Sequence, residues 1–483
     1  MDTSVTKRMA KSFSWLVLGE IIGRGISFLA VIYIARILGA AAFGLLNFAQ
    51  AFQSYLVLIV DSGLSTLGMR EIARLKSNAG AISINIYAIR FFIALIVFVV
   101  SALILFMLPL DFRLRWLFIG AFLFVFYRAF NADWVFQGME KMDYVAYPKI
   151  IYSALCLLFL ILMVKSSADL VTASFIYAVI GILTSLVFLF ILFKWIAPAS
   201  RQNLLPKQWW QYFSEAIPLG ASVILTQIYY NIDTIMLGFM DKPEVVGYYN
   251  AANKILSIFI GVLALWTTTA FPIIGKRIME DINWVASFLN KYVKLTLMVI
   301  IPVMLLTAIL APFIIDTIFG LEYRSAALAL QILIWGVVLL ALSNTYGVLI
   351  LVPLGKSKEF MYGVGSGAIF NLILNALLIP AYSYIGAAVA TVLSEAIVLL
   401  VMYYLSRDRL RISIFKNLRN PLIGSMVALM AYLLTLKLFP YGYLGIVSAS
   451  FAFMVIYLLV LLGMGEKPFI LSFFNKVVES DQT

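Results

Sequence analysis

The sequence lacks histidine altogether and has a single cysteine, Cys156, among its 483 residues. Intrachain disulfide bonds, metal sites built on thiolates or imidazoles, and Cys/His or Ser/His catalysis are therefore excluded together. Cys156 lies inside an apolar run and is interpreted as a small core residue. We also expect that the protein is not an enzyme and that it carries no cofactor or metal ion.

Charge is scarce as well, because only 12% of the residues are charged. By contrast, 64% are hydrophobic, and the mean hydropathy is +1.03. Both values lie far outside the range of soluble domains. The composition therefore predicts an integral membrane protein.

Apolar stretches that are long enough to cross a membrane recur along the whole chain. Since a span needs about 20 residues, the pattern predicts an all-α polytopic membrane protein with about fourteen transmembrane helices. The loops are short, which leaves no room for an extramembrane domain. The first stretch has no small-residue cleavage site and is read as a retained helix. The predicted spans are 12–36, 43–67, 82–108, 114–137, 148–165, 171–195, 213–240, 245–272, 290–317, 325–352, 360–380, 384–406, 420–439 and 442–464.

An even number of spans places both termini on one side of the membrane. Most of the 35 lysine and arginine residues fall in loops on that side, and Arg90 is counted among them. The positive-inside rule then predicts that both termini are cytoplasmic. The net charge of +12 is explained by a cytoplasmic face on anionic lipid, so no nucleic-acid partner is expected.

The two halves of the chain share a short repeat. "LGAAAFGLLNFAQ" at 38–50 aligns with "LGFMDKPEVVGYYNAAN" at 237–253. Gly44, Asn47, Ala49 and Gln50 correspond to Gly247, Asn250, Ala252 and Asn253. The repeat predicts two pseudo-symmetric six-helix lobes with a site between them near the membrane midplane. The predicted divisions are 1–200, 201–410, and 411–483 with the last two helices and a cytoplasmic tail.

Polar residues within the spans predict a partly cationic central cavity. A charge near the bilayer centre costs roughly 2.5 to 3.5 kcal/mol, so each must be paired or kept away from lipid. The cations and amides expected in the cavity are Arg24, Arg128, Lys254, Asn47, Gln50, Asn131, Gln227, Asn231, Asn250, Asn253, Asn371 and Asn375. The carboxylates are Glu20, Asp61, Asp133, Asp233 and Glu395.

Structural explanations stay open for several of these residues. Glu20 and Arg24 are four residues apart and could form an ion pair within one helix. Asp133 could reach the headgroup region, and Lys254 could extend toward it or pair with Asp233. The asparagines could simply hydrogen-bond neighbouring helices.

The run "NADWVFQGMEKMDYVAYPKI" at 131–150 resembles the Asp-Trp-x-x-Gln-Gly-x-Glu signature of bacterial polysaccharide flippases for O-antigen and exopolysaccharide. "ARILGAAAFGLLNFAQAF", "IYYNIDTIMLG" and "LVPLGKSKEF" also resemble segments of that family. The resemblance covers most of residues 10–410. It implies the fold of the multidrug/oligosaccharidyl-lipid/polysaccharide exporter superfamily, which is similar to that of multidrug (MATE) transporters.

For function, the resemblance implies alternating-access transfer of an undecaprenyl-pyrophosphate-linked oligosaccharide from the cytoplasmic to the periplasmic leaflet of a bacterial inner membrane. The cations would bind the pyrophosphate, the amides would bind the sugar, and the carboxylates would serve gating or coupling to H⁺ or Na⁺. Membrane lipids, a polysaccharide polymerase and a chain-length regulator are the implied partners. The product would enter surface polysaccharide.

Three alternative functions make different demands on the sequence. A drug/cation antiporter of the same superfamily typically has twelve helices and no arginines to compensate its carboxylates. A membrane-embedded glycosyl polymerase or ligase would need a sizeable periplasmic loop with catalytic residues. The substrate of a lipid II flippase also contains a pyrophosphate, and only the family-like motifs argue against this function.

The spans at 420–439 and 442–464 are interpreted separately. Between Leu422 and Gly463 the only charged residue is Lys437, so this pair is unsuited to line a sugar path. It is expected to form an apolar groove for the polyprenyl chain. The alternative is a lipid-facing brace or a dimer contact.

Overall fold

The computed structural model describes residues 3–196, 198, 204–407, 412–439 and 442–466. All regular elements in these ranges are helices, which confirms the predicted all-α class. The predicted cytoplasmic tail at 467–483 lies outside the described residues.

The number of spans follows from where helices break. Eleven described helices are long and apolar enough to cross a membrane. Two of them are really pairs: α1 (Thr3–Asp61) breaks at Gly39, and α14 (Ser357–Ser406) breaks at Ser383. The 32-residue helix α9 (Trp209–Met240) adds one more, so the predicted fourteen helices are confirmed. At Gly39 the backbone has φ 74°, a conformation that glycine adopts without a side-chain clash.

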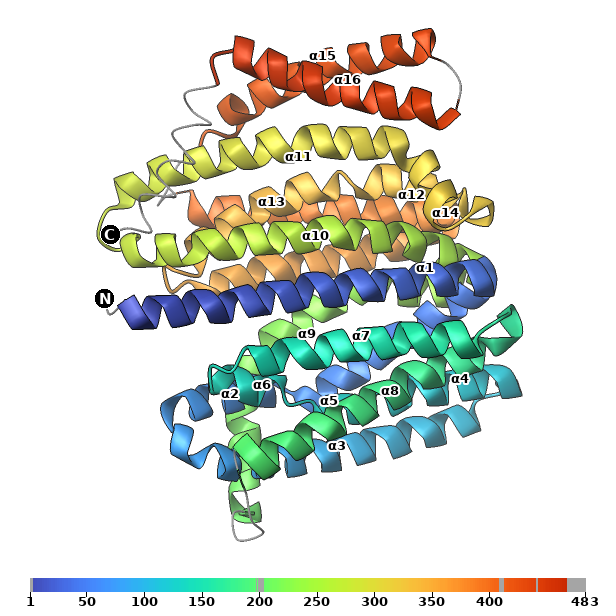
Figure 1. The fold of residues 1–483 in the computed structure, drawn as a ribbon, viewed down its shortest axis with the longest axis vertical. Coiled ribbons are helices and arrows are strands. Elements are labelled where there is room, and N and C mark those ends of the chain that lie inside the picture. The colour runs from blue at the N-terminus through green and yellow to red at the C-terminus, as the bar shows by residue number, and fades with distance from the viewer. Residues whose placement is uncertain (1–2, 197, 199–203, 408–411, 440–441, 467–483) are drawn as a thin grey trace. The chain divides into compact units, whose positions relative to one another are not determined.

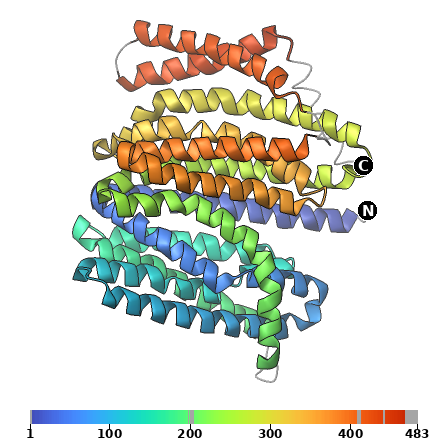
Figure 2. The same cartoon turned by 180° about the vertical axis from the view of Figure 1, so that it is seen from behind.

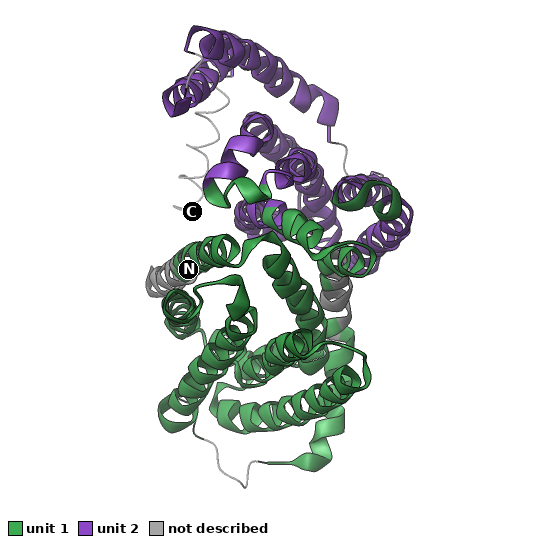
Figure 3. Ribbon diagram, turned by 90° about the vertical axis from the view of Figure 1, so that its right-hand side faces the viewer, with its two compact units in different colours: residues 1–251, 318–323, 379–384 green, residues 252–317, 324–378, 385–483 purple. Residues whose placement is uncertain are grey.

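The contacts divide the chain into two units (Figure 3). Unit 1 comprises 1–251, 318–323 and 379–384, and unit 2 comprises 252–317, 324–378 and 385–483. Helix α10 (Pro243–Arg277) contributes residues to both. The lobe boundaries read from the sequence at residues 200 and 410 stay a prediction.

Unit 1 is a bundle around a discontinuous fourth span. Helix α7 packs along α1, and α4 lies beside α8, as both ribbon views show (Figures 1 and 2). Besides α1, α9 and the start of α10, its helices are α2 (Leu64–Arg74), α3 (Ala79–Met107), α4 (Phe112–Leu123), α5 (Val125–Phe130), α6 (Asp133–Gly138), α7 (Asp143–Met163) and α8 (Leu170–Ile191). Short turns of 3₁₀ or π-helix lie at Lys76–Asn78, Ser167–Asp169, Leu192–Ile196 and Pro206–Gln208.

Two spans of unit 1 break at an acidic residue. The second span stops at Asp61 and resumes at Leu64, with positive φ at Ser62 and Gly63. A Cβ at Gly63 would lie 2.2 Å from the Ala216 carbonyl oxygen, so only glycine allows the bend to meet α9 this closely. The fourth span similarly breaks at 131–132, directly before Asp133. Breaks of this kind free backbone groups and occur in membrane proteins where polar sites are built.

The short segment 318–323, from the second half of the chain, packs in unit 1. The carboxylate of Glu322 accepts a hydrogen bond of 2.7 Å from the Ala40 N–H, just after the Gly39 break. The Tyr323 hydroxyl donates to the Ala35 carbonyl at 2.8 Å. These bonds satisfy backbone groups that the break leaves free, and they explain why 318–323 belongs to unit 1.

Unit 2 ends in a helix pair that packs on α11. Tyr457 donates to the Met298 carbonyl at 2.6 Å, and Lys294 and Glu466 pair at 2.6 Å. Helices α15 and α16 lie side by side next to α11 in Figure 1. Besides α14 and the rest of α10, the helices of unit 2 are α11 (Ile282–Ile318), α12 (Ala326–Leu333), α13 (Gly336–Tyr346), α15 (Ile414–Leu438) and α16 (Gly442–Gly463), with a π-helical turn at Gly347–Leu351.

Candidate functional site

A cluster of three charged side chains lies inside unit 1, where the second span breaks. Arg90 of α3 and Arg128 of α5 bring one guanidinium nitrogen each to within 3.5 and 3.1 Å of the Asp61 carboxylate. Ser65 also donates to Asp61, at 2.5 Å. Because two cations share one carboxylate, the cluster keeps a net positive charge. Arg90 is fully buried, whereas a third of the Arg128 side chain is exposed, so Arg128 remains accessible to an anion.

The assignment of Arg90 to a cytoplasmic loop was wrong. The residue is the twelfth of α3, about 16 Å along the helix axis from Ala79. Its guanidinium donates to the Arg128 carbonyl as well, which ties α3 to α5. The sequence signal was present, because Arg90 stands between Ile89 and Phe91, well inside a predicted span. Charge counting alone attributed it to the nearest loop.

Glu20, Arg24 and Lys149 form a second charged group in unit 1. The anticipated pair between Glu20 and Arg24 is present at 2.6 Å. Lys149 of α7 approaches the other oxygen of Glu20 at 2.9 Å. This group also keeps one net positive charge, and most of the Arg24 side chain is exposed.

Asp133 begins α6, and its surroundings are set by the break before it. Asn131 is buried, and its side-chain oxygen accepts from the Asp133 N–H at 3.1 Å. The Asp133 Oδ1 atom is buried and forms no hydrogen bond within the described part of the chain. Lys149, Arg128 and Arg90 all interact electrostatically with this carboxylate. The buried Oδ1 atom of Asp133 thus lies within unit 1, near these three cations.

The repeated motif serves packing between helices. A Cβ at Gly44 would lie 1.9 Å from the Pro243 carbonyl oxygen, and one at Gly247 would lie 2.2 Å from that of Ala40. The contacts are reciprocal, because each glycine meets the residue four positions before the other. The matching asparagines also behave alike: Asn47 donates to the Phe43 carbonyl and Asn250 to that of Val246, four residues back in the same helix.

The remaining predicted residues of unit 1 lie on α1 and α9. Asp233 is buried and accepts a 2.5 Å hydrogen bond from Tyr249. Asn231 donates to the Gln227 carbonyl at 3.2 Å within α9. Gln50 is partly buried on α1. None of these contacts joins the residues to the Asp61 cluster.

Unit 2 brings together a different set of predicted residues. Asn371 and Asn375 are fully buried in the first half of α14 and hydrogen-bond to each other at 3.0 Å. Gly363 and Gly367 allow close approach of Met402 and Val398 from the second half, and this register places Asn371 opposite Ser394, which precedes the buried Glu395. Asn253 and Lys254 are partly buried on α10.

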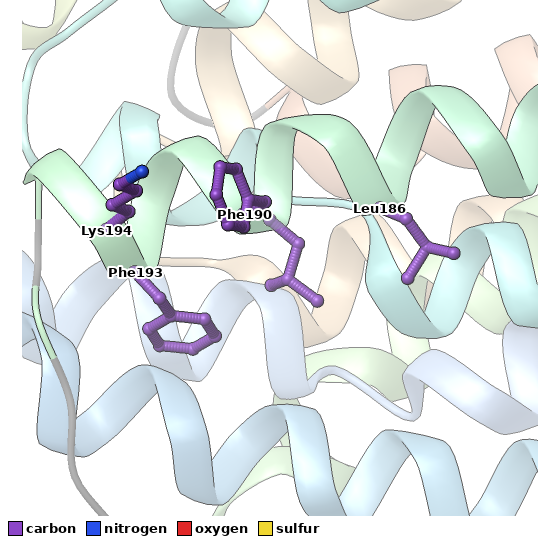
Figure 4. Close-up of a pocket in the computed structure, with 5 residues that line it drawn as sticks. Leu186, Phe190, Phe193 and Lys194 are labelled. Atoms are coloured by element: carbon purple, nitrogen blue, oxygen red, sulfur yellow. The ribbon is translucent and has the colours of Figure 1, made fainter.

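An apolar groove at the end of α8 lies apart from all these groups (Figure 4). It is lined by Leu186, Leu189, Phe190, Phe193 and Lys194. Leu186 and Phe190 are exposed on the face of α8 that carries other exposed apolar residues. The groove therefore belongs to the lipid-facing surface and contains none of the predicted site residues.

A model of the family described as "Polysaccharide biosynthesis protein" matches residues 9–277. The chain is 24% identical to the putative O-antigen transporter of Escherichia coli (strain K12), over 78% of this chain and 91% of that protein. It is 30% identical to the probable flippase AglR of Haloferax volcanii, over about a third of each chain (34% and 35%).

Solved transporter structures share the fold. The lipid II flippase MurJ in an inward closed conformation matches with a TM-score of 0.77 and 14% identity, over 94% of this chain and 99% of that one. An inward-facing multidrug transporter of the MATE family matches with a TM-score of 0.66 and 15% identity, over 82% and 98%. At these identities the likeness concerns the fold alone.

Proposed function

Because the chain belongs to the polysaccharide biosynthesis protein family, whose curated relatives above are a transporter and a flippase and not enzymes, we propose that it is a flippase for lipid-linked oligosaccharides. The substrate would be an undecaprenyl-pyrophosphate-linked repeat unit, which moves from the cytoplasmic to the periplasmic leaflet of a bacterial inner membrane. Both termini would be cytoplasmic, and the product would supply surface polysaccharide, handed on to a polymerase and a chain-length regulator.

The observation that carries this proposal is the shared carboxylate of the Asp61 cluster. A pyrophosphate needs cations in a site of low dielectric, where charge-assisted hydrogen bonds are strong. Arg90 is buried and holds Asp61, while the partly exposed Arg128 can exchange its carboxylate partner for a phosphate. The planar guanidinium offers two parallel donors to phosphate oxygens, which a lysine does not.

The other predicted residues keep their proposed roles. Arg24 and Lys254 would add positive charge along the path, and the amides of Gln50, Asn131, Gln227, Asn231 and Asn253 would meet sugar hydroxyls. Asn47, Asn250, Asn371 and Asn375 are more strongly engaged within the protein. Transport would proceed by alternating access and be coupled to H⁺ or Na⁺. The coupling groups would be carboxylates, because intramembrane carboxylates bind and release cations: Glu20, Asp61, Asp133, Asp233 and Glu395.

Complementation tests the proposal. The chain is expressed in strains that each lack a defined polysaccharide flippase, and the surface polymer that returns is read by gel. Arg128→Ala should abolish the polymer without lowering the amount of protein in the membrane, and Arg128→Lys should restore part of it. The matched control is Arg324→Ala, because Arg324 is an exposed cation of unit 2 with a weak 4.0 Å pair to Asp316. Normal export by the Arg128→Ala variant would show that the cluster is structural.

A further inference from the structure

Four aromatic side chains meet beside Arg128 in unit 1. We call Phe124, Tyr127, Tyr152 and Tyr177 the tyrosine platform. The rings of Tyr127 and Tyr152 stack with centroids 5.6 Å apart and an interplanar angle of 21°. Phe124 packs on Tyr127 at 4.7 Å. Tyr177 of α8 lies near Cys156, one turn after Tyr152 on α7. Three helices therefore contribute to one aromatic surface.

The platform is on the inward side of its helices. The exposed apolar residues of α7 include Ile151 and Leu158, and those of α8 include Val179 and Leu183. The helical period places Tyr152 about 100° from Ile151 and Tyr177 about 160° from Val179. Both tyrosines are nevertheless partly exposed. Tyr152 stacks on Tyr127 and Tyr177 lies near Cys156, so both rings contact other helices of unit 1.

The local sequence builds this surface. A Cβ at Gly181 would lie 3.1 Å from the Tyr127 ring and 3.3 Å from the Phe124 ring, so glycine lets both rings lie against α8. Asn131, one turn after Tyr127, donates to the Tyr127 hydroxyl at 3.4 Å. Phenylalanines would pack as well at lower desolvation cost, yet three of the four rings carry hydroxyls inside the membrane. The Tyr177 hydroxyl forms no hydrogen bond to another described residue, so it stays available to a ligand.

We propose that the tyrosine platform binds the sugar ring that is attached directly to the pyrophosphate, an inference that rests on the proposed function. The C–H groups on one face of a pyranose carry partial positive charge and pack on the negative face of an aromatic ring. The tyrosine hydroxyls and the Asn131 amide meet the ring hydroxyls at the edge. The first sugar and the pyrophosphate are bonded to each other, and the Tyr127 hydroxyl lies within electrostatic range of the Arg128 guanidinium. The platform thus sets specificity for the first sugar, while Arg128 binds the part common to all such lipids.

The test separates these two contributions. Geranylgeranyl pyrophosphate is used bare or linked to glucose, galactose or N-acetylglucosamine, and its binding to the full chain in lipid nanodiscs is measured. Wild-type protein should prefer at least one glycosylated probe over the bare one. Tyr152→Leu should lower that preference about tenfold, which corresponds to one stacking contact, and leave binding of the bare probe within about twofold. Tyr152→Trp should keep the preference, and so should the control Tyr147→Leu, on the lipid face of α7.

Two further variants test the platform, and the results separate its failure from failure of the proposed function. If Tyr152→Leu does not fold, Tyr177→Leu must give the same loss of preference. Gly181→Val should also weaken the preference, because it displaces the rings without removing one. A wild-type protein with no preference for any glycosylated probe, or a folded Tyr152→Leu or Tyr177→Leu variant that retains it, overturns the platform. Arg128-dependent binding of the bare probe would still support the proposed function, whereas no binding of any pyrophosphate probe would overturn both.

Discussion

Unit 1 and unit 2 bury polar residues of different kinds. In unit 1, Asp61 and Arg90 are held between three helices together with Arg128, and no other described residue hydrogen-bonds to the buried Oδ1 of Asp133. In unit 2, the buried polar residues include Asn371 and Asn375, which hydrogen-bond to each other, and Glu395. The Asp61 cluster has two cations and one acid, whereas the residues of unit 2 are neutral amides and one acid. Within a chain that carries an internal repeat, this asymmetry points to different duties for its two halves.

The repeat itself is retained where packing demands it. Gly44 and Gly247 make reciprocal close contacts, and Asn47 and Asn250 bond to their own helices in the same manner. The charge is not repeated, because Ala264 stands in the second copy where the first has Asp61. The shared residues therefore determine the fold, and the unshared ones are the better candidates for function.

Among the variants considered, removal of Asp61 should lower the free energy of unfolding the most. Asp61→Leu leaves Arg90 buried without its carboxylate, and losing one member of a buried ion pair costs about 3–5 kcal/mol. The free energy of unfolding in mixed micelles measures this loss. The double variant Asp61→Leu/Arg90→Met should recover stability but not export, because it restores an apolar core but lacks Asp61, one of the carboxylates proposed for ion coupling. Equal stability of the single and double variants would contradict the pairing.

The packing glycines should give the next largest effect. Gly247→Val places side-chain atoms where even a Cβ would be 2.2 Å from the Ala40 carbonyl oxygen, so the helices must separate. We expect a loss of about 3 kcal/mol, at the upper end for overpacking, measured by the same unfolding assay. The control is Gly275→Val on the same helix, because nothing lies within 4 Å of a Cβ there. Similar losses for both variants would show that the repeat has no special packing role.

Much of this arrangement follows from the sequence, and the exceptions share a cause. Helix number, the breaks near Gly39 and Ser383, and the pair between Glu20 and Arg24 depend on hydropathy, short-range geometry and helical period. Lys149 meets Glu20 across 129 positions, and Arg90 meets Asp61 from a third helix. Such contacts depend on which helices become neighbours, and a single sequence contains no record of that. The role of Asn47 is equally ambiguous in the sequence, since an amide that bonds its own helix and one that binds a ligand can occupy the same position.

A smaller loss of stability is expected when the contact between α11 and the C-terminal helix pair of unit 2 is weakened. Lys294→Met removes the partner of Glu466, whose side chain is almost fully buried, although Asn420 still donates to it. We expect a loss of about 2 kcal/mol, in the range of a hydrogen bond to a charged group, seen as earlier proteolytic release of the α15–α16 pair. Glu466→Gln alone should cost less, because the amide keeps the bond from Asn420. Undiminished protection of the pair in Lys294→Met would show that apolar packing on α11 alone holds it, and would favour a purely lipid-facing brace.

The smallest effect is expected at the amides of unit 2, and it sharpens the comparison with unit 1. Asn371→Leu removes the acceptor of the 3.0 Å bond from Asn375, and hydrogen bonds between side chains in membrane helices are worth only about 1 kcal/mol. Stability should therefore change little, in contrast to Asp61→Leu. If the neutral group serves ion coupling through Glu395, export by Asn371→Leu should nonetheless lose its response to a change of the H⁺ or Na⁺ gradient, and Glu395→Gln should lose it too. The comparison is read in right-side-out vesicles that carry a fluorescent lipid-linked sugar, with each gradient imposed separately. A gradient response that stays intact in both variants would assign the amides to packing and leave coupling to the carboxylates of unit 1.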